Sequence, residues 1–167
     1  MDILAILLRL LHIILGVFWA GTAFFNVLIL EPRLRWMGPA FQNPVMNALI
    51  PVIGPMMTLS SFVVLGTGVA LSLMSWTTFG ALFSTSTGWM LFAGFAFTIG
   101  AMAVGLGFIA PTGKRLERLS KTLEGRVPGP DETLQLAQLS GRIETLSRLN
   151  SILLLLAVGT MVLFRYI

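Results

Sequence analysis

Four long apolar segments dominate this chain of 167 residues. A helix needs roughly 20 apolar residues to cross the hydrocarbon core of a bilayer, and each segment is close to that length. Because 56% of the residues are hydrophobic and only 11% are charged, a soluble domain could not bury all of this apolar surface. The sequence predicts one integral membrane domain over residues 1–167, an all-α bundle of four transmembrane helices. The predicted spans are Ile3–Leu30, Val52–Ser75, Trp89–Ala110 and Leu149–Arg165.

Prolines set the expected ends of the spans. We expect the first helix to stop at Glu31-Pro32, because proline interrupts the helical hydrogen-bond ladder. Asn43-Pro44 is predicted to cap and open the second helix, whose entrance Pro51 and Pro55 would bend or break. The third span ends at a similar proline, in Ala110-Pro111. This internal repeat of a proline at the end of a span predicts two helical hairpins arranged in parallel.

The cations are concentrated in two of the three connections between the spans. Arg33 and Arg35 lie in the first connection, whereas the second, 76–88, carries no charge. By the positive-inside rule, the first and third connections are cytoplasmic and both termini face outward, N-out and C-out. Although the net charge is +4, this distribution indicates topology in a lipid bilayer and argues against nucleic acid as a partner. The third connection and its flanks carry Lys114, Arg115, Arg118, Lys121, Arg126, Arg142 and Arg148.

Residues 112–148, between the last two spans, are predicted to form a cytoplasmic helical hairpin extension. Glu117 lies four residues before Lys121, a spacing that places an ion pair on one helical face. Asp131 is expected to cap the returning helix after a turn at 125–130. We interpret the hairpin as a solvated extension of the two spans, with binding to anionic lipid headgroups as the alternative.

One pair of ionisable residues lies deep inside an apolar segment. Arg9 and His12, the only histidine, stand three residues apart in the first span and therefore share a helical face. That face continues through Gly16 and Trp19 to Asn26. Ionisable groups are costly in hydrocarbon and usually mark a functional site. Arg9 can extend toward the outer headgroups, but His12 is too short and needs a partner inside the bundle.

Binding of a b-type haem is the first chemistry that suits this site. A neutral imidazole is a common axial ligand, so His12 is the predicted ligand and Arg9 the partner of a propionate. Trp19 would wall the macrocycle, and Gly16 belongs to the same predicted cofactor-binding face. If the two hairpins are aligned on their prolines, Leu91 matches His12. A second axial ligand would then be a methionine, or His12 of a second copy.

Copper handling is the second chemistry. Imidazole and thioether ligands suit Cu(I), and the candidate metal set is His12, Met56, Met57 and Met90. The chain has no cysteine, and its nine methionines show no Met-x-x-Met tract. Thioethers in a membrane chain serve equally well in packing or in lipid contact.

Proton relay through titration of His12 is the third chemistry. No carboxylate lies within the predicted spans to complete a proton path, and Glu31 at the cytoplasmic edge comes closest. Against all three stands a structural role, in which His12 only hydrogen-bonds a neighbouring helix. Polar partners for that role are Asn26 and the hydroxyl cluster Thr58, Ser60 and Ser61.

The first 35 residues carry a recognisable pattern: Arg9-Leu10-Leu11-His12-Ile13-Ile14, then Trp19, Gly21 and Pro32-Arg33-Leu34. This pattern resembles the first helix of the CopD/HemJ group of small bacterial membrane proteins. The resemblance implies a compact four-helix, multi-pass protein of the bacterial inner membrane, whose first-helix histidine is the functional position. HemJ-like proteins are associated with b-type haem and protoporphyrinogen oxidation, and CopD-like proteins with copper.

Two departures separate the chain from the HemJ pattern. Arg9 stands where those proteins carry a lysine near the histidine, and the third span has no lysine. The likeness therefore points to the CopD-like side, and no enzymatic activity is inferred from it.

Three functions follow from the sequence. The leading hypothesis is a haem-binding membrane protein that transfers electrons through the His12 site. The alternative is copper uptake or resistance, using histidine and methionine ligands. The third is a non-catalytic accessory subunit of a membrane complex. The expected assembly is a homodimer or a larger membrane complex.

Overall fold

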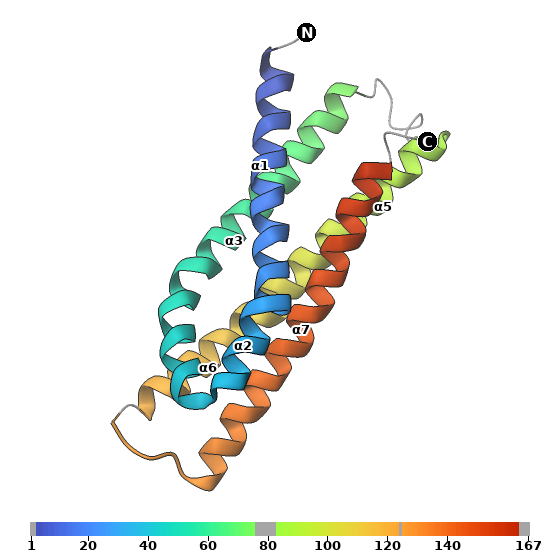
Figure 1. Cartoon of the computed structure of the whole chain (residues 1–167). Coiled ribbons are helices and arrows are strands. Elements are labelled where there is room, and N and C mark those ends of the chain that lie inside the picture. The colour runs from blue at the N-terminus through green and yellow to red at the C-terminus, as the bar shows by residue number, and fades with distance from the viewer. Residues whose placement is uncertain (1–2, 76–82, 124, 164–167) are drawn as a thin grey trace.

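The computed structural model describes residues 3–75, 83–123 and 125–163, and these residues are almost entirely helical. They form an all-α four-helix bundle built from two helical hairpins, as the sequence predicts (Figure 1). By length and composition the chain is a multi-pass membrane protein. The four helical runs able to cross a membrane are Ile3–Met37, Pro44–Met74, Ser86–Thr122 and Pro130–Leu163.

The first hairpin consists of a long composite helix and a returning helix. Helix α1 (Ile3–Phe25) continues through the π-helical turn η1 (Asn26–Leu30) into α2 (Glu31–Met37). Gly38 then adopts φ +83°, a conformation that glycine takes without steric cost, and the chain reverses. Helix α3 (Pro39–Ser75) returns along α1.

The expected stop at Glu31-Pro32 is wrong, because the helix passes through this proline. Pro32 has no N–H to donate to the carbonyl four residues earlier, and in an α-helix its ring would also clash there. The turn η1 widens the helix just before it, where the Glu31 N–H bonds to the Asn26 carbonyl five residues back. A wide turn relieves the clash, so the helix continues to the reversal at Gly38.

The second hairpin repeats this arrangement. Helix α5 (Ser86–Val104) runs through the π-helical turn η2 (Gly105–Ile109) into α6 (Ala110–Thr122), and α7 (Pro130–Leu163) returns. The Ala110 N–H bonds to the Gly105 carbonyl, and a proline follows directly, as it does after η1. The structure thus confirms the parallel between the two hairpins and extends it to a shared backbone distortion.

Helix α3 begins earlier than expected. The prediction that Asn43-Pro44 opens it is wrong, because the helix starts at Pro39, directly after the reversal at Gly38. Three prolines lie inside the helix, spaced seven and four residues apart and therefore on one face. Their bends add in one direction, and α3 curves accordingly around the bundle (Figure 1).

Helices α6 and α7 run through most of residues 112–148, the segment for which the sequence predicts a helical hairpin extension. The expected cap does not come from Asp131, which lies in the first turn of α7. Instead Glu132 accepts a hydrogen bond of 2.9 Å from the Gly129 N–H and forms an ion pair with Arg126. A carboxylate three residues into a helix that bonds back to the preceding N–H is one half of a capping box.

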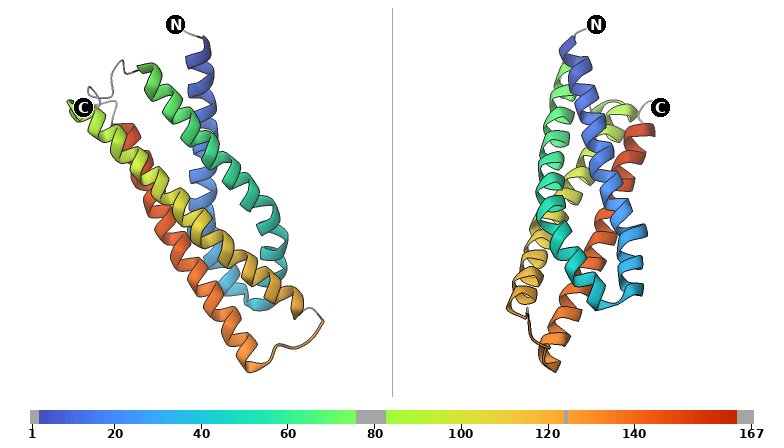
Figure 2. Two further views of the ribbon diagram at one scale, coloured as in Figure 1. Left: turned by 180° about the vertical axis from the view of Figure 1, so that it is seen from behind. Right: turned by 60° about the vertical axis from the view of Figure 1, so that its left-hand side comes forward.

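The bundle core lies where the two hairpins meet. Helix α1 packs mainly against α3 and α5 against α7, and α7 also reaches α1 (Figure 2). In the second hairpin Gly94 allows the closest approach, since a Cβ there would lie 2.8 Å from Oγ1 of Thr160. The buried hydrophobic cluster consists of Trp19, Ala23, Val64, Ala101 and Leu154.

Candidate functional site

His12 lies where α1 crosses the C-terminal half of α3. Its Nδ1 atom is 3.0 Å from the carbonyl oxygen of Val64 and 3.0 Å from Oγ1 of Thr67. The imidazole is half-buried, so one part of the ring faces α3 while another stays accessible at the bundle surface. The histidine is therefore fixed by a neighbouring helix within its own hairpin.

The hydrogen-bond network determines which ring nitrogen carries the proton. The Thr67 hydroxyl donates to the Val63 carbonyl at 2.6 Å, so its oxygen is available to His12 as an acceptor. The Val64 carbonyl is an acceptor only. Two acceptors at Nδ1 assign the proton to this atom, and in the neutral imidazole Nε2 then has a free lone pair.

Gly68 allows the imidazole to lie close to α3. A Cβ at this position would lie 3.2 Å from Cε1 and 3.7 Å from Nδ1 of His12. The first distance is tighter than an ordinary van der Waals contact. By contrast, a Cβ at Gly66 or Gly16 would meet no heavy atom within 4 Å. Gly68 is thus a packing partner of the histidine, while the space beside Gly16 is open.

The other residues of the predicted cofactor-binding face lie in different surroundings. Trp19 is 5% exposed and belongs to the core cluster, roughly 10 Å farther along α1 than His12. Gly16 is half-buried, one turn from His12. Arg9 is exposed, one turn on the outward side, and none of the ion pairs among the described residues includes it. The face therefore runs from the surface at Arg9 into the core at Trp19.

The structure does not gather the candidate copper ligands. Met57 precedes Thr67 by ten residues in α3, which separates it from the His12 contact by roughly 15 Å along the helix. Met56 lies beside it in the chain, and Met90 belongs to α5, which packs mainly against α7. Within the described parts of the chain, no three side chains of the His, Cys, Asp and Glu types form a metal-binding group.

Sequence reasoning missed Thr67, the side-chain partner of His12. The hydroxyl cluster proposed instead bonds within its own helix: Thr58 donates to the Gly54 carbonyl and Ser61 to the Thr58 carbonyl. The hairpin reversal at Gly38 holds the signal that could have found the partner. His12 lies 26 residues before it and Thr67 lies 29 after it, and antiparallel helices joined by a short turn bring such positions together.

A second polar layer lies deeper, where α7 contacts the first hairpin. The Ser151 hydroxyl donates to the Ala23 carbonyl at 3.4 Å. The side-chain oxygens of Asn26 and Asn150 are buried and have no hydrogen-bond partner among the described residues. Asn26 was anticipated as a polar contact for His12, but it follows His12 by 14 residues and lies roughly 21 Å along the helix from it.

Comparisons with protein-family models, with characterised proteins and with solved structures find no match to this chain. The resemblance of the first 35 residues to the CopD/HemJ group therefore stays a prediction.

Proposed function

We propose that this chain is a haem-binding membrane protein in which Nε2 of His12 is an axial ligand of a b-type haem. The observation that supports the proposal is the double contact of Nδ1 with Val64 and Thr67, at 3.0 Å each. Metal-ligating histidines commonly donate the other ring N–H to a carbonyl or a similar acceptor, which fixes the tautomer and orients the ring. The Nδ1 contacts of His12 have this arrangement.

The surroundings of His12 favour a haem at the bundle surface. Leu11 and Ile13, on either side of it, are 44% and 60% exposed, so apolar surface is available beside the imidazole. The open space at Gly16 adds room for a macrocycle one turn inward. Arg9 lies one turn outward, where a guanidinium suits a propionate that points toward the headgroups. Trp19 lies too deep in the core for the wall role that the sequence suggested.

Bound haem would supply one-electron redox chemistry, and the protein would supply the ligand and the propionate partner. Met56 and Met57 lie roughly 15 Å or more along α3 from the His12 contact, so a second ligand would be another residue or another molecule. A second copy of the chain, offering its own His12, is the simplest source.

An absorption spectrum of the full chain, purified in mild detergent and titrated with haem, tests this proposal. We expect a Soret band that saturates at no more than one haem per chain and is lost in His12→Ala. Met57→Leu and Met90→Leu serve as controls and should leave the band unchanged. A preparation that stays colourless after haem addition would contradict the proposal, as would an unchanged band in His12→Ala. Stoichiometric copper in place of haem would favour copper handling, and co-purified subunits with neither cofactor would favour an accessory role.

A further inference from the structure

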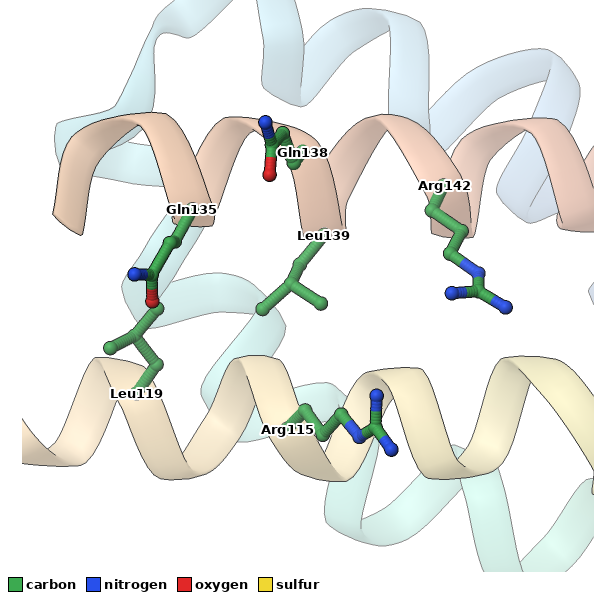
Figure 3. A pocket seen from close by; sticks show the side chains of 6 residues that line it. All are labelled: Arg115, Leu119, Gln135, Gln138, Leu139 and Arg142. Atoms are coloured by element: carbon green, nitrogen blue, oxygen red, sulfur yellow. The ribbon is translucent and has the colours of Figure 1, made fainter. Parts of the chain in front are cut away.

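A pocket of about 400 Å³ lies between α6 and α7, in the hairpin that the charge distribution places in the cytoplasm. Two arginines from opposite helices line it: Arg115 on α6 and Arg142 on α7 (Figure 3). Gln135 and Gln138 add amide groups, and Leu119 and Leu139 supply the apolar contacts. The lining therefore combines two fixed positive charges with neutral hydrogen-bonding groups and contains no carboxylate.

Three glutamates of this region pair with other cations. Glu117 pairs with Lys121, Glu132 with Arg126, and Glu144 with both Arg148 and Arg35. None of the ion pairs in the described parts of the chain includes Arg115 or Arg142. Two guanidinium groups that line one space without a counter-charge repel each other, so the pocket favours an anion.

The geometry of the groups indicates which anion. An arginine presents a planar fork of N–H donors that matches the oxygens of a phosphate group, and such pairs are frequently bidentate. Arginines from two helices can bind the oxygens of one phosphate from two sides. A carboxylate offers only two oxygens, so it uses this set of donors less fully.

The two arginines lie just beyond the ends of the apolar segments, next to the headgroup layer of the membrane. Arg115 follows the end of the third apolar segment, Ala110, by roughly 8 Å of helix. Arg142 precedes the start of the fourth, Leu149, by roughly 10 Å. The headgroup layer on each side of the hydrocarbon core is about 5–8 Å thick, and the cytoplasmic leaflet carries the anionic lipids.

We propose that Arg115 and Arg142 form a binding site for a phosphate group, and that the headgroup of an anionic phospholipid of the cytoplasmic leaflet supplies it. The bound phosphate links α6 to α7 at the membrane surface, because each helix contributes one arginine. The site is independent of His12 and of the haem proposal.

Native mass spectrometry of the full chain, released from micelles of mixed phosphatidylglycerol and phosphatidylcholine, tests the site. We expect the wild-type chain to retain phosphatidylglycerol in preference to phosphatidylcholine. The double variant Arg115→Lys, Arg142→Lys keeps the net charge but loses the bidentate geometry, and its preference should fall about tenfold. Arg118→Gln removes an exposed α6 cation that does not line the pocket. Its preference for phosphatidylglycerol should fall only roughly fivefold, the effect of removing one surface charge.

Two further measurements distinguish the source of the phosphate and control for folding. In nanodiscs of pure phosphatidylcholine, inorganic phosphate should not raise the unfolding temperature of the wild type if the ligand is a lipid. If it does raise it, and the double variant loses the effect, the site is confirmed with free phosphate as its ligand. Equal unfolding temperatures in phosphatidylcholine alone show that the variants fold. An unchanged preference in the lysine double variant, or an equal loss in Arg118→Gln, would overturn the proposal.

Discussion

The imidazole of His12 occupies the space that a side chain at position 68 would need: its Cε1 atom lies 3.2 Å from the place where a Cβ of Gly68 would be. The same imidazole is held by Val64 and Thr67, the latter being the neighbour of this glycine in α3. The histidine is thus held by two hydrogen bonds to α3, and it can lie this close to α3 because residue 68 has no side chain.

Gly68→Ala should therefore displace the imidazole. The new methyl group would force a shift of a few tenths of an ångström and weaken the Nδ1 hydrogen bonds. We expect the free energy of unfolding of Gly68→Ala to be lower than that of Gly66→Ala by about 1–2 kcal/mol, measured by reversible unfolding in detergent. Gly66→Ala is the matched control, because its Cβ would meet nothing within 4 Å. Equal stabilities would show that His12 is not fixed by this contact.

Thr67→Val should remove one of the two acceptors of the His12 Nδ1–H. The Val64 carbonyl remains, so we expect a loss of only about 0.5–1 kcal/mol in stability, typical of hydrogen bonds between transmembrane helices. Thr67→Ser keeps the hydroxyl and should behave as the wild type. If haem is bound, its Soret band should shift in the valine variant alone. A serine variant as weakened as the valine variant would assign the effect to the lost methyl group.

Gly94→Ala should separate α5 from α7. Its Cβ would lie 2.8 Å from Oγ1 of Thr160, too close to be tolerated without movement. We expect destabilisation of about 1–3 kcal/mol. Thr160→Ala removes that oxygen, and combining the two should recover most of the loss in a double-mutant cycle. Gly159→Ala, which meets no neighbour, is the control on α7. A strictly additive double variant would contradict this contact.

Arg35→Gln should loosen the link between α2 and α7 only slightly. Arg35 pairs with Glu144, which also pairs with Arg148, but the arginine is 65% exposed. Exposed ion pairs contribute about 0.2–1 kcal/mol and are screened by salt, so the loss should be within that range and vanish in high salt. Arg33→Gln, an exposed neighbour, should cost nothing measurable. A larger loss that persists in salt would indicate a role beyond charge pairing.

The number of helices and the hairpin layout could be predicted from the sequence, because four long apolar segments admit few arrangements. The helix ends at proline could not. Whether Pro32 ends a helix depends on whether the preceding turn can widen, and η1 shows that it does. Likewise, Pro44 indicates a helix start, yet α3 begins at Pro39, directly after the chain reverses at Gly38. In both cases a proline signal was present, but the backbone conformation before the proline decided its outcome.

The candidate site, too, could be predicted only in part from the sequence. That His12 needs a partner follows from the cost of a polar group in hydrocarbon, and the structure confirms a partner. Its identity depends on the register of α1 against α3, which composition does not reveal. The pocket between Arg115 and Arg142 was hidden for a different reason. The four-residue spacing indicates which glutamates pair within one helix, but it does not reveal which residues of α6 and α7 face each other and line the pocket.

The π-helical turns have a mechanical consequence. A helix bends most easily where its hydrogen-bond ladder is already interrupted, so the first and third runs each contain a pivot at η1 and η2. Helix α7 is continuous from Pro130 to Leu163 and has no pivot of this kind. The arm from Asn26 to Ile3 is roughly 35 Å long. A rotation of a few degrees at the pivot would move the Ile3 end of this arm by several ångströms relative to α7. The end of the bundle that holds Ile3 and His12 is thus the end at which this bundle can change width.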